Sequence, residues 1–425
     1  MPDQTPPDSP SAIGARTIDP RFEAFSYPAY RNFWVARFLS AFSINMIAVA
    51  VGWQIYDLTR DPLDLGLIGL SQFAPAVVLV LITGAAADRY GRRNIMLLSE
   101  TAFFIVALGL FLLTWHGLTS PIPVFALLVL MGIARAFYGP ATSSLVVNLV
   151  PERVFPNAVT WSSSSWQVAS IVGPVAGGLL YGGGALVPYA AALILLAIAI
   201  VFLTQIPSDE RVAQIEEEDK KSQIFAGFKF IFGQPVVLGA ISLDLFAVLL
   251  GGAVALLPVF ARDVLELGPW GLGLLRAAPG IGAVVMAAYL ASVPIKDHAG
   301  LFMFAGVAFF GAFTLTFGLS TVAWLSIVSM VLLGAADMIS VQVRETLIQL
   351  WTPDDVRGRV NAVNGLFVGA SNELGEMRAG AMAAVIGAVP AVIVGGAGTI
   401  LVAGIWAYAF PALRKIRYLD RRGEV

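Results

Sequence analysis

Two glutamates, Glu373 and Glu376, stand inside an otherwise apolar stretch at 360–386, in the string Ser371-Asn372-Glu373-Leu374-Gly375-Glu376-Met377-Arg378. Residues three apart share a face of an α-helix. At about 1.5 Å per residue, Glu373 would lie about 20 Å from Val360, past the middle of a hydrocarbon core of about 30 Å. Because burial disfavours the charged form, such a carboxyl group can bind and release a proton near neutral pH. We expect proton coupling here, with Arg378 as a modulating or pairing cation; a salt-bridged structural cluster is the alternative.

Further ionisable side chains lie in other apolar stretches. Arg135 falls about halfway along 122–147, where a charge is costly unless it faces a polar cavity or a partner. Asp337 falls in 322–347. Both join the proton-coupling candidates; a structural ion pair is the alternative for Arg135, and a charge pair between Arg135 and Asp337 is a further hypothesis. Arg37 and Glu100 lie near the ends of their stretches, and we expect them to extend to the membrane interface.

Polar but uncharged side chains in the apolar stretches are candidates for a substrate cavity: Asn45, Gln54, Gln167 and Asn372. Cysteine is absent, and the two histidines, His116 and His298, lie far apart, so we expect no metal site and no cofactor. No nucleophile elbow G-x-S-x-G occurs, which argues against an enzyme. The net charge of −2 argues against binding of nucleic acid.

The elements that must position these residues are membrane helices. Hydrophobic residues make up 58% of the chain and charged residues 13%, against about 25% charged in soluble domains. A span needs about 20 mostly apolar residues. This criterion predicts an all-α polytopic membrane protein with twelve spans: 32–56, 63–87, 95–115, 122–147, 158–182, 184–205, 236–261, 269–293, 299–318, 322–347, 360–386 and 388–411.

The spans divide into two sets of six around a long hydrophilic break at 207–235. Gly132-Ile133-Ala134-Arg135 aligns with Gly334-Ala335-Ala336-Asp337, which predicts two pseudo-symmetric six-helix bundles, although chance similarity between apolar helices is an alternative. The expected organisation is a disordered cytoplasmic tail at 1–28, an N-terminal bundle at 29–205, a cytoplasmic linker at 206–235, a C-terminal bundle at 236–411 and a basic cytoplasmic tail at 412–425.

Basic residues indicate the orientation. Most of the 26 Lys and Arg residues fall in the tails and in every second loop, and cytoplasmic loops collect positive charge during insertion. We therefore expect both termini in the cytoplasm.

A charged loop follows the second span: Gly84-Ala85-Ala86-Ala87-Asp88-Arg89-Tyr90-Gly91-Arg92-Arg93. It resembles the loop signature of the major facilitator superfamily, G-x-x-x-D-R-x-G-R-R, at every defining position. Gly84 permits close helix contact, and Gly91 can adopt the positive φ of a tight turn. The resemblance implies a gating loop in which Asp88 contacts the start of the eleventh span near Val360. The alternative is that the three arginines are only interface anchors.

Two further strings resemble signatures of transporters in that superfamily. Arg135-Ala136-Phe137-Tyr138-Gly139 resembles the R-x-x-x-G of proton antiporters. Gly173-Pro174-Val175-Ala176-Gly177-Gly178 resembles the G-P-x-x-G-G of exporters, although Ala169 stands where the longer signature has glycine. Pro174 removes a backbone donor and the glycines allow tight packing, so the string predicts a bend or a sliding contact. Ordinary packing of a kinked helix is the alternative.

The segments 30–34, 52–59 and 66–70 are similar to the superfamily branch that includes bacterial enterobactin and drug exporters. This resemblance implies alternating access in a proton-coupled exporter, an antiporter, of amphipathic small molecules such as siderophores or drugs. It implies a monomer in the bacterial cytoplasmic (inner) membrane whose partners are the substrate, protons and lipid. The alternatives of the same fold are a solute importer and a lysophospholipid or lipid transporter.

Overall fold

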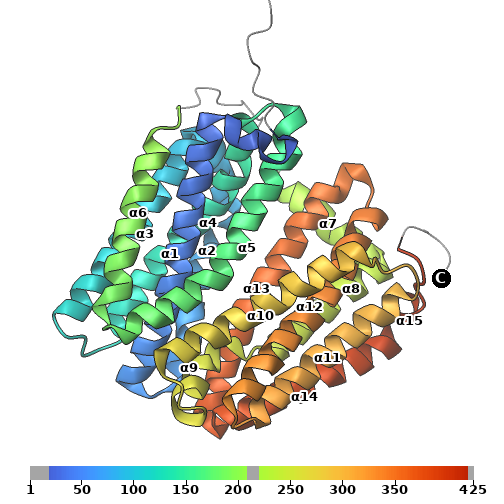
Figure 1. Cartoon of the computed structure of the whole chain (residues 1–425). Coiled ribbons are helices and arrows are strands. Elements are labelled where there is room, and N and C mark those ends of the chain that lie inside the picture. Colours follow the sequence, from blue (N-terminus) through green and yellow to red (C-terminus); the bar gives the residue numbers. More distant parts are fainter. Residues whose placement is uncertain (1–18, 208–219, 420–425) are drawn as a thin grey trace, which may run out of the picture.

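The computed structural model describes residues 19–207 and 220–419, without the side chains of 80–82, 84–89, 220–226 and 355. All regular elements of these described residues are helices, and the long ones form two groups (Figure 1). The first group consists of α1 (Pro28–Thr59), α2 (Pro62–Tyr90), α3 (Arg92–Trp115), α4 (Ile122–Leu149), α5 (Phe155–Gly182) and α6 (Leu186–Thr204). We call it the N-terminal bundle.

The second group, the C-terminal bundle, begins with a broken helix. It consists of α8 (Pro235–Gly251), η3 (Val254–Leu256), α9 (Leu257–Val259), the π-helix η4 (Phe260–Val264), α10 (Gly268–Ser292), α11 (Ala299–Leu319), α12 (Ala323–Trp351), α13 (Asp354–Ile386) and α14 (Ala388–Ala409). If α8 to η4 are counted as one span, each bundle has six spans. The predicted fold class, twelve membrane helices, is confirmed.

Ten helices of the described chain are long and apolar enough to cross a membrane. Two long helices, α5 and α13, fall short because of their polar residues: serines at 162–165 in α5, and the charged string around Glu373 in α13. Both pack across the seam between the bundles, α5 against α10 and α13 against α2. Of the four serines, Ser162 and Ser165 are buried by protein contacts, and Ser163 and Ser164 are exposed.

Short elements lie where tails and a linker were predicted. Residues 20–26 form the 3-10 helix η1 (Pro20–Ser26), so the expected disordered tail at 1–28 is wrong for this part, and residues 1–18 lie outside the described residues. Phe25 packs edge-on against Trp161, with ring centroids 5.2 Å apart, and anchors η1 on α5. Within the predicted linker, α7 (Lys220–Gly233) packs against α13. The tail begins with the short helix α15 (Pro411–Arg414).

Glycines set two of the tight connections. Gly91, between α2 and α3, has φ 82°, as its place in the loop string suggested, and Gly387, between α13 and α14, has φ 91°. A side chain at either position would be strained.

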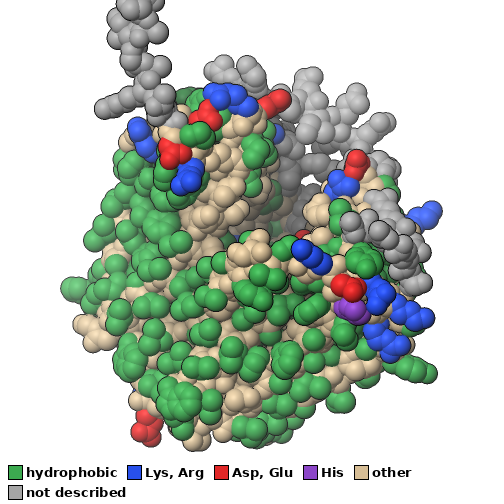
Figure 2. All heavy atoms as spheres, turned by 45° about the vertical axis from the view of Figure 1, so that its right-hand side comes forward, with side chains coloured by type: hydrophobic (Ala, Val, Ile, Leu, Met, Phe, Trp, Pro, Cys, Tyr) green, Lys and Arg blue, Asp and Glu red, His purple; other side chains and the backbone are tan. Residues whose placement is uncertain are grey.

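Hydrophobic side chains cover most of the molecule, and charged ones gather along its upper and right-hand edges in Figure 2. Exposed residues include large apolar side chains such as Val385 and Leu401, which are 84% and 64% exposed. Such a surface is unstable in water and fits a lipid environment.

Candidate functional site

A cavity of about 170 Å³ lies between the two bundles. It is lined by α1, α2, α4 and α5 from one bundle and by η3, α9, α10 and α13 from the other. We call it the central cavity. Its lining comprises Ile44, Asn45, Ile47, Ala48, Val51, Gly52, Leu65, Ile68, Gly69, Gln72, Leu128, Met131, Arg135, Trp166, Ala255, Pro258, Arg276, Glu373 and Glu376.

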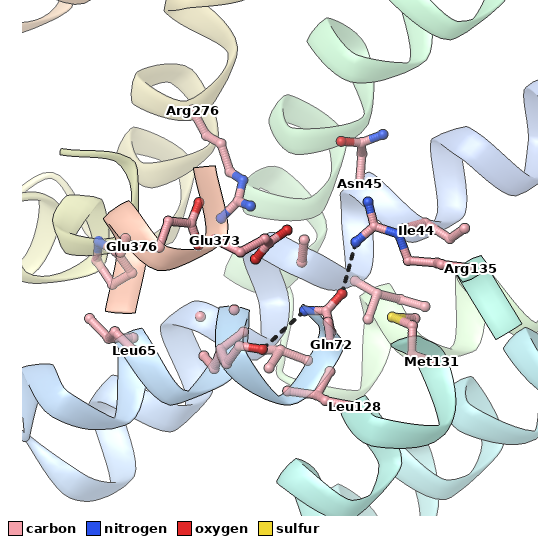
Figure 3. A pocket seen from close by; sticks show the side chains of 18 of the residues that line it. Ile44, Asn45, Leu65, Gln72, Leu128, Met131, Arg135, Arg276, Glu373 and Glu376 are labelled. Atoms are coloured by element: carbon pink, nitrogen blue, oxygen red, sulfur yellow. Dashed lines mark hydrogen bonds between the residues drawn. The ribbon is translucent and has the colours of Figure 1, made fainter. Parts of the chain in front are cut away.

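Four charged side chains meet in this cavity. Glu373 and Glu376 of α13 lie beside Arg276 of α10 on one side, and Arg135 of α4 lies on the other (Figure 3). The two carboxyl groups interact electrostatically with both arginines and, in the case of Glu373, with the neighbouring carboxyl group. No direct ion pair joins these groups in the described part of the chain. The carboxylates are therefore held in a polar cavity by charges at a distance and remain available to a proton or a ligand.

Arg135 is fixed by an amide rather than by an acid. Its Nη1 donates a hydrogen bond of 3.0 Å to Oε1 of Gln72, and Nε2 of Gln72 donates to the carbonyl oxygen of Ile68 on the same helix at 3.4 Å (Figure 3). Gln72 thus holds the guanidinium group at the boundary between α2 and α4 without neutralising it.

Gly69 of α2 packs directly against the two carboxylates. A Cβ atom at this position would lie 2.9 Å from Oε2 of Glu373 and 3.1 Å from Oε2 of Glu376. One turn earlier on α2, Gly66 packs against Gly380 of α13. A Cβ atom at Gly380 would lie 2.8 Å from the Cα atom of Gly66. A side chain at residue 69 would displace the carboxylate ends, so glycine at this position leaves the proton-coupling candidates their present space.

A second cavity, of about 370 Å³, continues from the central cavity between α2, α4 and α13. The two share Gln72, Arg135 and Glu373, and the second is otherwise lined mainly by apolar residues such as Phe73, Ala362 and Leu366. Polar groups at one end and apolar walls along the rest fit a molecule with both kinds of surface.

Of the four predicted polar cavity residues, only Asn45 lines the central cavity. The amide of Gln54 is held inside the N-terminal bundle, where it accepts a hydrogen bond of 2.7 Å from Tyr189 and donates one of 3.0 Å to Thr114. Asn372 donates to the carbonyl oxygen of Val368 on its own helix, and Gln167 lines none of the cavities described here. None of these three residues lines the cavities described here, so their place in a substrate cavity stays a prediction.

Arg378 does not pair with the glutamates. Its Nε and Nη2 donate to the carbonyl oxygens of Leu249 and Leu250, at 2.8 Å and 2.5 Å. These carbonyl groups lie at the end of α8, where the break after Gly251 removes their helical partners. Arg378 therefore caps a broken helix, and the expectation that it pairs with the carboxylates is wrong.

Asp337 lies away from Arg135, inside the C-terminal bundle near Asp244 and Arg344, which form a buried ion pair. The hypothetical pair between Arg135 and Asp337 is therefore not formed.

The expectation that Glu100 extends to the membrane interface is wrong. This residue is fully buried and accepts a hydrogen bond from Ser40. Only Oε1 of Glu100 accepts this hydrogen bond, and Oε2 is buried without a hydrogen-bond partner among the described residues.

The charged loop string is described only in part. The side chains of Gly84, Asp88 and Arg89 lie outside the described residues, and the contact expected between Asp88 and Val360 lies with them. Arg92 donates to the carbonyl oxygen of Ser144 on α4 at 3.0 Å. Arg93 donates to those of Leu203 and Thr204 at 3.3 Å and 2.8 Å, at the end of α6. The two arginines thus join three helices of the N-terminal bundle.

The glycine string of α5 makes close contacts on two sides. A Cβ atom at residue 177 would lie 2.7 Å from the carbonyl oxygen of Met46 on α1, in the same bundle. On the other side, a Cβ atom at Gly273 of α10 would lie 2.6 Å from the carbonyl oxygen of Pro174. Gly173 packs on α1 and Gly178 on α10 in the same way. The string therefore lets the backbone of α5 touch helices of both bundles.

Ion pairs join the bundles near this contact, at the ends of α1 and η4. Arg262 is 2.5 Å from Asp57, and Arg60 is 3.2 Å from Asp263, which also accepts a hydrogen bond from Tyr56. Each bundle supplies one acid and one base, so the two pairs are reciprocal. We call this region, with Gly178 and Gly273, the closed end.

Comparison with known proteins decides the family. Residues 20–422 match the major facilitator family described as transmembrane secretion effector. The chain belongs to this family. It is a multi-pass membrane transporter of the secondary type, not an enzyme.

The transporter is similar to the enterobactin exporter EntS of Escherichia coli O1:K1 / APEC and to that of Citrobacter koseri. Each is 26% identical over 399 residues, which cover 92% of this chain and 94% of the relative. Among solved structures, a bacterial homolog of the human lysosomal transporter Spinster covers 97% of this chain and 100% of its own, with a TM-score of 0.71 and 15% identity. A transporter of the POT family has a TM-score of 0.70 and 13% identity over 90% of this chain and 96% of its own.

Several residues of the transporter's site escaped prediction. Gln72, Arg276 and Gly69 line the central cavity, and Asp57 and Arg262 join the closed end. Arg276 carried a usable signal, because an arginine inside a span needs a cavity or a partner. Asp57 and Arg262 sit at predicted span ends, where charged residues are ordinary, so nothing in the sequence distinguished them.

Proposed function

We propose that this transporter is a proton-coupled exporter, an antiporter, of amphipathic small molecules such as siderophores or drugs. It works by alternating access in the bacterial inner membrane, with both termini in the cytoplasm. The observation that carries the proposal is the meeting of Glu373 and Glu376 with Arg135 and Arg276 in a cavity built by both bundles. The similarity to enterobactin exporters favours outward transport over import.

The coupling follows from charge. When Glu373 and Glu376 are ionised, they balance the two arginines, and the central cavity is close to neutral. When a proton binds, the arginines dominate the cavity, and the contact of α13 with Gly69 changes because a carboxylic acid has a different hydrogen-bonding requirement from a carboxylate. Protonation therefore changes both the affinity for substrate and the packing between the bundles, which are the two quantities that an antiporter must link.

The domain organisation supports the same mechanism. The two six-span bundles form separate bodies that meet at the closed end, while cavities occupy the seam elsewhere. We propose that the bundles rock about this seam and that the charged loop at 84–93 holds the opposite end when it closes. In this proposal the transporter acts as a monomer, because the two bundles that rock against each other belong to one chain.

Secretion by cells tests the direction and the substrate class. Cells with and without the transporter are compared for export of, and sensitivity to, a panel of siderophores and amphipathic antibiotics at several pH values. We expect lower retention of at least one compound in producing cells. The variant with Glu373→Gln and Glu376→Gln should lose this effect, whereas Glu152→Gln, on the exposed turn η2 (Glu152–Val154), should keep it. Accumulation of a compound by producing cells would show import, and flipping of labelled phospholipid in vesicles would show a lipid transporter.

A further inference from the structure

A side cavity of about 320 Å³ extends from Arg135 into the N-terminal bundle. It shares Ile44, Arg135 and Trp166 with the central cavity, and α1, α3, α4 and α5 supply its whole lining. A molecule in the central cavity can therefore place one group in the side cavity, where it touches residues of one bundle only.

The side cavity is positively charged. Its lining contains Arg37 and Arg135 and no carboxylate. In the described part of the chain, Arg37 makes neither a hydrogen bond nor an ion pair, and Arg135 binds the uncharged amide of Gln72. The nearby carboxyl group of Glu100 is fully enclosed beside Ser40 and does not line the cavity. Arg37 has no acidic partner among the described residues, and the acids that interact with Arg135, Glu373 and Glu376, lie in the central cavity and not in the side cavity. The lining of the side cavity therefore favours an anion.

Aromatic rings form the walls. Phe103 and Tyr138 pack edge to face, with ring centroids 5.5 Å apart at an interplanar angle of 61°. Trp166, which is 45% exposed, lies at the boundary with the central cavity. The hydroxyl groups of Thr142 and Ser143 donate to carbonyl oxygens of their own helix, at 2.7 Å and 3.1 Å. The free donors of the lining are therefore the two guanidinium groups and the hydroxyl group of Tyr138, and Trp166 is its most exposed aromatic ring.

We propose that the side cavity binds an anionic aromatic group of the transported molecule. Arg37 and Arg135 bind the acidic oxygens, and Trp166 and Tyr138 contact the ring. The proposal deepens the function proposed above and rests on it for the identity of the ligand as the transported molecule. It assigns substrate recognition to the N-terminal bundle and proton binding to α13 of the C-terminal bundle. When the bundles rock, the side cavity that binds the substrate then moves relative to Glu373 and Glu376.

Calorimetric binding to the purified full-length transporter tests the ligand class with matched probes. The aromatic anion 2-naphthoate should bind at least about tenfold more tightly than neutral 2-naphthamide, because a charge-assisted hydrogen bond contributes roughly 1.5–3 kcal/mol. It should also bind more tightly than cyclohexanecarboxylate, an anion without an aromatic ring. Equal binding of 2-naphthamide would overturn the charge requirement, and equal binding of cyclohexanecarboxylate would overturn the aromatic one.

Variants locate the binding. Arg37→Gln should weaken 2-naphthoate about tenfold, Arg37→Lys should weaken it less, and Trp166→Leu should weaken it while leaving cyclohexanecarboxylate unchanged. The matched control is Arg31→Gln, an exposed arginine earlier on α1 that should have no effect. If Arg37→Gln, Arg37→Lys and Trp166→Leu all bind 2-naphthoate as Arg31→Gln does, the assignment of the side cavity is wrong. Binding at equilibrium needs no proton gradient, so this failure is distinguishable from failure of proton-coupled export.

Discussion

The space around Glu373 and Glu376 is set by one missing side chain, at Gly69. Replacing it with alanine places a Cβ atom 2.9 Å from one carboxylate oxygen and 3.1 Å from the other, closer than carbon and oxygen normally pack. The carboxylates or α2 must shift, and the proton site changes although no charge is removed. A glycine in a membrane helix is often explained by helix contact alone; here it also contacts ionisable atoms.

We therefore predict that Gly69→Ala lowers proton-driven export several-fold while the protein still reaches the membrane. Export and membrane abundance are measured together in cells. The control is Gly404→Ala on α14, where a Cβ atom would meet nothing within 4 Å. Wild-type export by Gly69→Ala would show that the carboxylates tolerate a change in their packing and would argue against a role for this contact.

Side-chain identity was easier to predict than side-chain direction. The sequence indicated that Glu373, Glu376 and Arg135 need a polar cavity, because a charge in hydrocarbon is costly wherever it points. The neutral amides gave no such constraint. The amide of Gln54 forms hydrogen bonds with Tyr189 and Thr114 inside its bundle, and that of Asn372 donates one to a carbonyl group of its own helix. Local hydrogen bonds thus account for the direction of two of the four amides, Gln54 and Asn372.

Among the helices, the broken span α8–η4 contacts α13 near the proton-coupling candidates at its break and forms part of the closed end at its last turn. Its free carbonyl groups after Leu249 are capped by Arg378, two residues from Glu376 on α13, and its last turn supplies Arg262 and Asp263 to the closed end. The sequence predicted a single span at 236–261. Hydrophobicity gave no sign of the break, but the pair Gly251-Gly252 and Pro258 did, because such residues mark turns and kinks. The partner that satisfies the freed carbonyl groups comes from α13 and could not be predicted.

At the closed end, we predict that Arg262→Gln weakens the contact between the bundles. Its ion pair with Asp57 is partly exposed, and such pairs contribute about 0.2–1 kcal/mol, so the population open at this end should rise by up to a few-fold. The measurement is the rate at which an impermeant maleimide, added outside, labels a single cysteine at Ala48 in the central cavity. Exchanging the charges, with Asp57→Arg and Arg262→Asp together, should restore slow labelling.

A matched control for this prediction is Arg153→Gln. Arg153 is also 2.5 Å from its partner, Glu23, but both belong to the N-terminal half of the chain, and the pair does not cross the seam. Its loss should leave the labelling rate unchanged. Equal rates for Arg262→Gln and Arg153→Gln would mean that the reciprocal pairs do not hold the closed end.

For the molecule as a whole, the membrane constrains the fold more strongly than any motif does. Because each span needs about 20 apolar residues, the number of spans could be read from the sequence before any contact was known. The ends of the spans were less certain: α12 continues to Trp351 and α13 already begins at Asp354, ahead of the predicted start at residue 360. The facing ends of these two helices are polar, so apolar character does not mark the helix there.

The orientation of the whole chain gives a prediction of its own. The sequence contains no cysteine, so a single introduced cysteine reports one position without background. His116→Cys, in the exposed turn after α3, should react with an impermeant maleimide in intact cells. Arg31→Cys, near the start of α1, should react only after the membrane is permeabilised. The reverse pattern would place both termini outside and would contradict the charge rule on which the orientation is based.

The central claim is that Glu373 and Glu376 couple protons to export, and transport by the purified protein in liposomes tests it most directly. Wild-type protein should exchange labelled for unlabelled substrate without a gradient and should concentrate substrate when a pH gradient is imposed. The variant with Glu373→Gln and Glu376→Gln should keep the exchange and lose the concentration against the gradient. Undiminished concentration by this variant under the same pH gradient would contradict the account.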